Sequence, residues 1–573
     1  MNRRRWWQTG EYSVEGEERA FADAGLDFEL DREAFEQEEV VVFRGDLRLD
    51  DRRVGAEVRY PPSYGEGEPV AVIAAALPIG RHRTPEGALC LDHPVLGEVR
   101  PMGGAEAVQR AERLWWLWEN DRDALRAEEA DAPDPRANYY IHEPATAVAI
   151  TDADLTGFRE GEFRVNVVSL RPFRGGVTWL RATSPGMQEI PLDRERAVLA
   201  ADFGVGGFWR RVDSAPSGQT AAEVHRWAKA KAGDMLDRAI GLAEIDRGSR
   251  RRADIPALVA FVYPDEGPRR NEYHDAWLFL LVRQDGSVEL PRPFPLRTEE
   301  RWLRQPHLEP LAGKSVAIVG LGALGSPLAA LLGRAGVGRF VLCDPDIVTI
   351  GNRVRHELDL ADLGQAKVHA VTGRLRRINP WVSEIVTVGL RFGSAMNGRS
   401  AAQLQRLDDE AAAAFADCDL IVNATAHTAT GYHLSRLGRE SGTPVLHTWV
   451  SAGAWGGRVL VQNVGSGCLL CLAYAQEEAV AGAEPVPEVS DDPEVIEVLE
   501  RGCADPTFTG AGFELTDAAA AAARVAVQRL LEGNGYPARD FDLLTLGFRT
   551  GEAAQRTAIH SRLPVHPDCT ICQ

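Results

Sequence analysis

Short runs of apolar residues alternate with glycine- and proline-bearing turns over the first 300 residues, a pattern typical of strands joined by tight turns. Strands are predicted at 40–43, 70–77, 147–150, 258–262 and 277–282. Helices are predicted at 105–126, where tryptophan and leucine recur at helical spacing, and at 221–240. The acidic, proline-bearing segment 128–135 separates the two groups of elements. We therefore predict a first α+β domain over 1–135 and a second mixed α/β domain over 136–304.

From about residue 305 the pattern changes to strand, glycine turn, helix and strand, which is typical of a parallel sheet covered by helices. The apolar run 315–319 is predicted to form a buried strand, and 326–335 to form the helix after the glycines. A second predicted strand, 339–343, ends directly at Asp344. The chain is thus predicted to be an α/β multidomain protein whose third domain, 305–573, has a Rossmann-like sheet.

The turn between that strand and helix contains Gly320, Gly322 and Gly325. Glycines at such a turn let the backbone approach a phosphate, and the helix N-terminus adds free N–H groups and a positive dipole end. Asp344 follows at about the distance of 20 residues expected for a carboxylate that binds a ribose hydroxyl. These residues predict a nucleotide site, but alone they fit a nicotinamide or flavin oxidoreductase equally well.

Composition narrows the class of partner. The 573 residues include 64 Lys+Arg and 84 Asp+Glu, and the resulting net charge of −20 argues against broad binding to nucleic acid. The sequence shows neither an export signal nor an apolar run long enough to cross a bilayer, so we expect a cytoplasmic protein without a membrane partner. Four basic residues are lysines: Lys229, Lys231, Lys314 and Lys367. A GC-rich genome favours such a bias.

Two Cys-x-x-Cys pairs stand far apart in the third domain, Cys468 with Cys471 and Cys569 with Cys572. Each pair supplies two thiolates from one tight turn, and four thiolates complete a tetrahedral zinc site with no open position. We therefore predict a structural zinc ion. A buried or redox-active pair is the alternative, and His566 is a weaker candidate ligand.

The residues after the second strand separate the nucleotide-binding classes. Asn352-Arg-Val-Arg355 and then Gly364-Gln-Ala-Lys367 follow in order. With the glycine turn they resemble the ThiF/MoeB/ubiquitin-activating superfamily, whose members adenylate protein C-termini with ATP and magnesium. The resemblance covers about 305–573 and implies a homodimer through this domain.

The resemblance also assigns roles. It implies that ATP is held by Gly320, Gly322, Gly325, Asp344, Asp346, Asn352, Arg355 and Lys367. Arg355 is implied to be catalytic as well, because cations around the triphosphate stabilise charge while a carboxylate attacks the α-phosphate.

One segment departs from the family pattern. The family usually has Asp-x-Thr-Asp-Asn after a later strand, with an aspartate that binds magnesium. Here the strand 420–422 leads into Asn423-Ala-Thr425-Ala-His427, and Asp417 and Asp419 stand at the wrong spacing. Either Asp346 and the phosphates hold magnesium, or adenylation is slower.

Two further cysteines have chemistry to offer. Cys503 lies on a glycine- and proline-bearing loop before an alanine-rich helix predicted at 516–531, where a thiol could capture an acyl adenylate. Cys90, in Gly87-Ala-Leu-Cys-Leu-Asp, follows strands and precedes the tryptophan-bearing helix, and this segment resembles the ubiquitin-conjugating fold. His82 stands eight positions before Cys90, where that family has an asparagine, and could stabilise an oxyanion or orient an amine.

A conjugating-like domain ahead of an activating-like domain resembles the fused enzymes of bacterial antiphage CBASS operons. The resemblance implies that ATP adenylates a partner's C-terminus, Cys503 captures it as a thioester, Cys90 accepts it, and a target lysine receives it. The partner would be a CD-NTase or a small ubiquitin-like protein. A sulfur-carrier adenylyltransferase of the MoeB or ThiF kind is the main alternative, and a binding scaffold with a degenerate nucleotide site is another.

Overall fold

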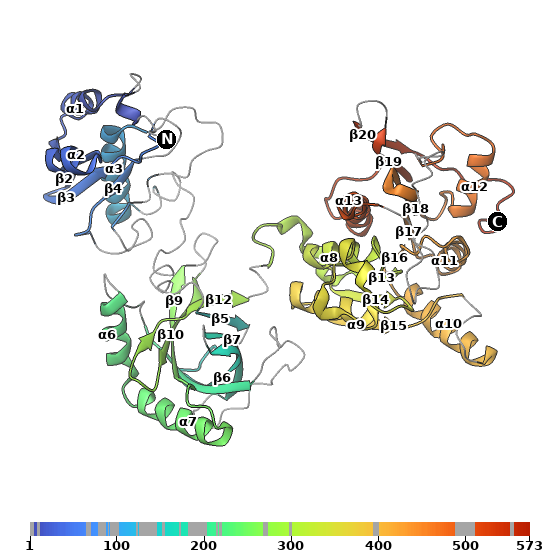
Figure 1. Cartoon of the computed structure of the whole chain (residues 1–573), viewed down its shortest axis with the longest axis horizontal. Helices are drawn as coiled ribbons and strands as arrows, with labels where there is room; N and C mark the ends of the chain where they lie inside the picture. Colours follow the sequence, from blue (N-terminus) through green and yellow to red (C-terminus); the bar gives the residue numbers. More distant parts are fainter. Residues whose placement is uncertain are drawn as a thin grey trace. The chain divides into compact units, whose positions relative to one another are not determined.

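The computed structural model divides the chain into two compact units, Met1–Arg297 and Thr298–Gln573 (Figure 1). It describes residues 5–8, 12–64, 70–77, 87–89, 91, 102–121, 124, 146–151, 155–170, 173–181, 203–213, 216, 221–266, 273–296, 301–393, 400–486, 510–550 and 555–573. Among these residues, no helix has both the length and the apolar character that crossing a bilayer requires.

The N-terminal part of the first unit contains a four-stranded antiparallel sheet in the order β1-β2-β3-β4. The strands are β1 (Phe28–Leu30), β2 (Val42–Leu49), β3 (Arg52–Arg59) and β4 (Ala71–Ile73). The helices are η1 (Trp6–Gln8), α1 (Val14–Asp23), α2 (Arg32–Glu38) and α3 (Gly104–Asn120). The strand predicted at 40–43 thus begins two residues later and runs to Leu49, and the helix predicted at 105–126 is described to Asn120.

A buried carboxylate ties three elements of this part together. Glu17 of α1 accepts hydrogen bonds from the hydroxyls of Tyr60 (2.6 Å) and Tyr64 (2.9 Å) and from the backbone N–H of Gly104 (3.1 Å). Burial next to this carboxylate strongly raises the pKa of Tyr60, so its hydroxyl stays protonated and acts as a hydrogen-bond donor. The turn after β3, helix α1 and the start of α3 are therefore fixed to one another.

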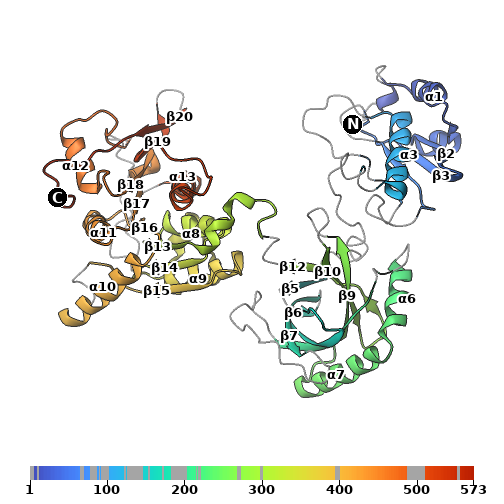
Figure 2. The same cartoon turned by 180° about the vertical axis from the view of Figure 1, so that it is seen from behind.

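The middle of the chain forms an eight-stranded mixed sheet in the order β11-β10-β9-β8-β6-β7-β5-β12. Its strands are β5 (Ala147–Thr151), β6 (Glu160–Leu170), β7 (Phe173–Arg181), β8 (Phe203–Arg211), β9 (Ala257–Glu266), β10 (Tyr273–Val282), β11 (Val288–Glu289) and β12 (Arg292–Leu296). Figures 1 and 2 show a helix, α7, along one face of this sheet. Leu242 of that helix packs directly over Gly206, where a side chain on β8 would collide with it.

The single helix predicted at 221–240 is wrong, because the structure has two helices, α6 (Ala221–Ala232) and α7 (Asp234–Arg250). Gly233 separates them with φ 50° and ψ −131°, a conformation outside the helical range that favours glycine. The prediction failed because helix-forming residues continue on both sides of this glycine.

The second unit has an eight-stranded sheet in the order β15-β14-β13-β16-β17-β18-β19-β20. Its strands are β13 (Ser315–Val319), β14 (Arg339–Cys343), β15 (Glu384–Val388), β16 (Leu420–Asn423), β17 (Val445–Val450), β18 (Gly456–Gln462), β19 (Leu543–Thr550) and β20 (Gln555–Ser561). The five strands β15, β14, β13, β16 and β17 are parallel to one another, whereas β18, β19 and β20 each pair antiparallel with the strand before them. The predicted strands 315–319 and 339–343 are confirmed to the residue.

Helices pack on both faces of this sheet. They are α8 (Gly325–Ala335), α9 (Lys367–Ile378), α10 (Ala401–Ala416), α11 (Thr428–Ser441), α12 (Leu469–Glu477) and α13 (Gly512–Leu530), with short 3-10 helices η4 (Pro306–Gly313), η5 (Ile350–Val354), η6 (Leu360–Asp362) and η7 (Ala452–Ala454). One buried apolar cluster joins α8, α9 and α13 to the sheet, and a second joins α10 and α11 to it. Cys343 and Cys418 belong to the second cluster, as small buried residues.

Candidate nucleotide site

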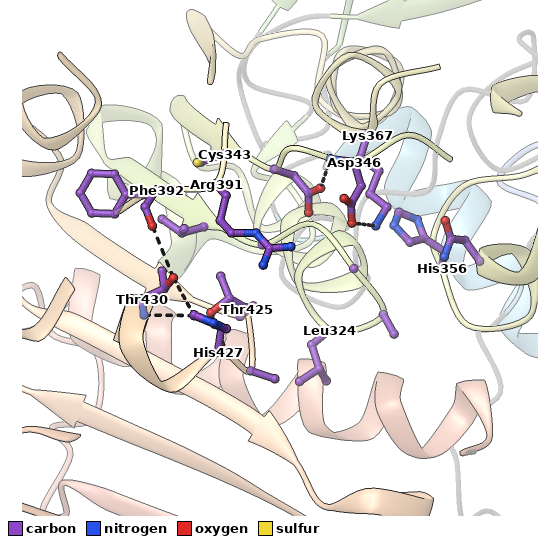
Figure 3. Close-up of a pocket in the computed structure, with 18 of the residues that line it drawn as sticks. Leu324, Cys343, Asp346, His356, Lys367, Arg391, Phe392, Thr425, His427 and Thr430 are labelled. Carbon is purple, nitrogen blue, oxygen red and sulfur yellow. Dashed lines mark hydrogen bonds and ion pairs between the residues drawn. The ribbon is translucent and has the colours of Figure 1, made fainter. Parts of the chain in front are cut away.

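A cavity of about 270 Å³ lies at the carboxyl ends of β13, β14 and β16. The connections after β13 and β16 leave the sheet on opposite sides of this point, which is where open parallel sheets bind ligands. Figure 3 shows side chains from several elements entering it. Seven of the eight predicted nucleotide residues line the cavity: Gly320, Gly322, Asp344, Asp346, Asn352, Arg355 and Lys367.

The three glycines of the turn have different structural reasons. A Cβ on Gly320, whose φ is 91°, would lie 2.8 Å from the backbone of Ala424, and one on Gly325 would collide with the carbonyl oxygen of Gly320. A Cβ on Gly322 would meet no protein atom within 4 Å. Gly322 lines the cavity, so a side chain there would fill space that a ligand can use. Gly325 is buried at the start of α8 and does not line the cavity.

Asp344 is a buried acceptor held by the backbone. Its carboxylate accepts from the N–H of Leu321 at 2.7 Å and from the N–H of Asp346 at 2.9 Å. Burial raises the pKa of this carboxyl, while Lys367 and the two N–H groups oppose that rise. Its remaining lone pairs can accept from a ligand hydroxyl, as the predicted ribose contact requires.

Lys367 and Asp346 form an ion pair with a separation of 3.0 Å between Nζ and Oδ2. The lysine side chain is only 8% exposed, whereas the aspartate side chain is 47% exposed. The backbone N–H of Lys367 also donates to the carbonyl of Asp346 at 2.9 Å. The start of α9 is therefore fixed to the segment after β14, with the ammonium directed to the cavity wall.

Asn352 and Arg355 lie on and just after η5. The side-chain oxygen of Asn352 accepts from the N–H of Thr349 at 2.9 Å, which closes a capping box for that short helix. His356, which follows Arg355, was missed by sequence analysis. Its Nε2 is hydrogen-bonded to the carbonyl of Leu321 in the glycine turn, and burial lowers its pKa to about 4. Neutral His356 is therefore bonded directly to the backbone of the glycine turn.

The loop 423–427 presents no carboxylate to the cavity. Asn423 turns away from it and lies buried under the loop, whereas Thr425, Ala426 and His427 line the wall. Asp419 lies at the other end of β16, where it accepts from the N–H and hydroxyl of Ser315, each at 2.8 Å. The departure from the family pattern is thus a real change in the chemistry of the site.

Arg391 and Phe392, which follow β15, also line the cavity and were missed. Figure 3 shows the guanidinium of Arg391 reaching across it. The signal that could have found them is their place after a parallel strand, at the same edge of the sheet as the glycine turn.

Magnesium fits this site poorly. Magnesium usually takes one or two carboxylates together with substrate phosphates. The described lining offers Asp344, which is buried and engaged by two N–H groups, and Asp346, which is paired with Lys367. These two carboxylates therefore do not provide the open ligand set that magnesium takes.

The four predicted zinc ligands come together. Sulfur separations are 3.8 Å for Cys468–Cys471, 3.5 Å for Cys468–Cys569 and 3.7 Å for Cys471–Cys572. A tetrahedral site with Zn–S bonds of about 2.3 Å has sulfur separations of roughly 3.8 Å, so the cluster fits zinc. Arg439 donates to the sulfur of Cys572 at 3.1 Å, which offsets thiolate charge. His566 does not join the cluster through its ring, which pairs with Glu478.

Cys90, His82 and Cys503 lie outside the described residues, so their assigned roles stay predictions. Two neighbours of Cys90 are described. Leu89 and Leu91 are both buried in the core of the N-terminal part, and Ala88 forms a β-bridge with Ile73 of β4. The segment on both sides of Cys90 is therefore anchored to that core.

Residues 299–514 match the model of the ThiF family. They form a ThiF family domain. The matched range contains every residue that sequence analysis assigned to the nucleotide.

One relative extends the likeness of the chain beyond the ThiF domain, and two others match a shorter part of it. The uncharacterized protein y4qC of Sinorhizobium fredii is 28% identical over 514 residues, covering 84% of this chain and 83% of that protein. The ATP-dependent ubiquitin transferase-like protein Cap2 of Pseudomonas aeruginosa is 28% identical over 223 residues, 37% of each chain. The adenylyltransferase and sulfurtransferase MOCS3 of Sus scrofa is 35% identical over 238 residues, 39% of this chain and 49% of that protein.

Proposed function

We propose that the chain adenylates the C-terminal carboxylate of a partner protein with ATP and then transfers the acyl group through cysteines to a target lysine. The observation that carries the adenylation step is the convergence of the glycine turn, Asp344 and Lys367 on one cavity of a ThiF domain. The similarity to Cap2, an ATP-dependent ubiquitin transferase-like protein, favours transfer to proteins. The setting that this suggests is antiphage defence of the CBASS type, with a CD-NTase as partner.

In the adenylation step, a carboxylate oxygen of the partner bonds to the α-phosphorus, and pyrophosphate leaves with the electron pair of the broken P–O bond. The turn and the N-terminus of α8 supply N–H donors to phosphate oxygens. Lys367 and Arg355 stabilise the charge that shifts onto the leaving group, and Asp344 accepts from the ribose. The ammonium of Lys367 is already fixed by Asp346 before ATP binds, so it needs little reorganisation.

In the transfer steps, the Cys503 thiolate attacks the acyl carbon and AMP leaves. The Cys90 thiolate then displaces Cys503, and a lysine amine finally displaces Cys90 to form an amide and release a proton. Support for Cys90 comes from its neighbours, since Leu89 and Leu91 anchor its segment beside the antiparallel sheet. That sheet and the helix α3 after it match the surroundings that the conjugating-family resemblance implies.

A second candidate is adenylation of a sulfur carrier. The similarity to MOCS3, an adenylyltransferase and sulfurtransferase, favours it. This reaction would use the same cavity and would need no acyl transfer to Cys90.

The experiment is a non-reducing gel of the full chain with ATP and a candidate partner encoded beside its gene. We expect the wild type to form two thiol-sensitive adducts and Cys503→Ala to form none. Cys90→Ala should form the adduct on Cys503 but no lysine conjugates. Cys418→Ala is the matched control, because that buried thiol lies on the opposite end of β16 from the cavity. Conjugation at the wild-type rate by both Cys90→Ala and Cys503→Ala would refute the transfer steps. ATP–pyrophosphate exchange without adducts would favour the sulfur-carrier reaction.

A further inference from the structure

The loop between β16 and α11 holds a histidine whose proton position is fixed. Nδ1 of His427 accepts from the backbone N–H of Thr430 at 3.3 Å and lies 3.1 Å from the Thr430 hydroxyl. A nitrogen that accepts an N–H carries no proton, so the neutral ring is protonated at Nε2. Nε2 is therefore a hydrogen-bond donor and not a metal ligand. Because His427 lines the cavity, this donor is available to an anionic ligand.

A buried network holds that loop in place. The side-chain oxygen of Asn423 accepts from the N–H (3.2 Å) and the hydroxyl (2.7 Å) of Thr425. Its amide nitrogen then donates to Nδ1 of His447 at 3.1 Å. Burial lowers the pKa of His447 to about 4, so both partners are neutral. Asn423, which stands where the family pattern begins with an aspartate, is thus paired with a neutral histidine, and no unpaired charge is buried.

The charge of the cavity is consistent with anion binding by side chains. Its charged lining consists of three cations, Arg355, Lys367 and Arg391, and two carboxylates, Asp344 and Asp346. Figure 3 shows Arg391 and His427 entering the cavity from two different elements. Within the described lining, the loop at 426 adds no negative charge that would need a metal ion beside the phosphates.

We propose that His427 donates a hydrogen bond to the ATP phosphates. Together with Arg391 it neutralises phosphate charge that a magnesium ion, held by a carboxylate, would otherwise neutralise. The inference rests on the proposed function and deepens it. As the P–O bond to the β-phosphate breaks, the electron pair moves onto the leaving pyrophosphate, where the Nε2–H stabilises it without transferring its proton. Nucleotide binding in this chain should accordingly depend only weakly on magnesium.

The test is titration calorimetry of the full chain with ATP, in EDTA and in excess magnesium, with adenosine as a probe that lacks phosphates. His427→Ser keeps a side-chain oxygen that can cap α11 but removes the Nε2–H donor. We expect it to weaken ATP binding in EDTA about 10-fold and to leave adenosine binding unchanged. His560→Ser is the matched control, on the exposed face of β20 and outside the cavity lining.

Ala426→Asp gives the converse test. Ala426 has φ 54°, which aspartate tolerates better than alanine, so the variant should fold. A carboxylate here should weaken ATP binding in EDTA and make magnesium restore it by about 10-fold or more, whereas the wild type should change by less than about 3-fold.

The outcomes separate the two proposals. Wild-type ATP binding that requires magnesium, or wild-type behaviour of both His427→Ser and Ala426→Asp, overturns the inference on its own. The proposed function is overturned if ATP binds neither in EDTA nor in magnesium. It is also overturned if ATP binds but no pyrophosphate is released with any partner present.

Discussion

Burial decides what each charged residue of the cavity can contribute. Lys367 is almost inaccessible to solvent, yet its ammonium is paired with the half-exposed Asp346, so its charge is fixed in position and held near where a phosphate would bind. A cation already ordered in this way stabilises a developing negative charge without paying for reorganisation during the reaction.

We expect Lys367→Met to slow adenylation, measured as pyrophosphate release, by roughly 100-fold, because one fixed transition-state donor is lost. Lys314→Met is the control. Lys314 pairs with Asp419 at 3.3 Å at the opposite end of the parallel strands, so its loss should leave the rate within about 2-fold of wild type. Equal rates for the two variants would contradict the assigned role of Lys367.

Buried His447 and half-buried His356 should make the stability of the ThiF domain depend on pH. Burial lowers the pKa of His356 and of His447 to about 4, whereas an unfolded histidine titrates near 6.5. Between these values the unfolded state binds more protons, so stability is full above about pH 6.5 and falls as pH drops toward 4. The slope is up to about 1.4 kcal/mol per pH unit for each histidine.

Thermal melts from about pH 4.5 to 7.5 check this, and His447→Gln should give a shallower slope than the wild type. A flat stability profile in the wild type would show that neither histidine is kept neutral by folding.

At the scale of elements, the second unit places its chemistry at helix and strand ends. α11 begins at His427 on the cavity wall, and Arg439 in its last turn donates to the sulfur of Cys572. One helix therefore connects the nucleotide cavity to the cysteine cluster. The cluster itself joins α12 to the last residues of the chain, which are distant in sequence.

The full chain should contain about one zinc ion per molecule by elemental analysis. Cys569→Ser or removal of the metal by a chelator should abolish that content and lower the melting temperature of the second unit, because a structural zinc ion stabilises only the folded state. Cys343→Ser serves as the matched control and should retain the metal. A metal-free wild type with an unchanged melting temperature would argue for a reduced, structural thiol cluster.

In the middle of the chain, one glycine separates two helices. We expect Gly233→Ala to destabilise the chain by about 1–3 kcal/mol in denaturant unfolding, since alanine is strained at φ 50° and ψ −131°. Gly241→Ala, inside α7 with no atom within 4 Å of the new Cβ, should instead stabilise it by about 0.5–1 kcal/mol. Equal effects of the two changes would mean that Gly233 is not constrained.

At the scale of the whole molecule, the scarcity of lysine leaves few amines open to acyl transfer. Lys229 and Lys231 on α6 are exposed, whereas Lys314 and Lys367 are both ion-paired and less accessible. If the chain forms activated acyl groups, any self-conjugates should concentrate on the two exposed lysines. Peptide mass spectrometry after incubation with ATP and partner checks this, and Lys229→Arg with Lys231→Arg should remove the signal. Modification mainly at Lys367 would contradict it.

The local sequence pattern predicted the structure correctly where it agrees with burial. Strands β13 and β14 were predicted to the residue because they are buried on both faces and read as unbroken apolar runs. It failed at Gly233, where helical propensity continues across a break. It also missed Arg391 and His356, because their approach to the glycine turn depends on how separate strands and loops meet in space. The neutral pair of Asn423 and His447 could not be inferred for the same reason.

The carboxylate of Glu17 also bears on how the N-terminal part is made during synthesis. Its hydrogen bonds reach Tyr60 and, much later in the chain, the backbone of Gly104. The contact between α1 and α3 therefore cannot close until residue 104 has left the ribosome, and such long-range closure slows folding. The segment that carries Cys90 is synthesised between these two anchor points. A nascent chain would therefore hold its proposed acceptor thiol in an incompletely closed domain until translation has passed α3.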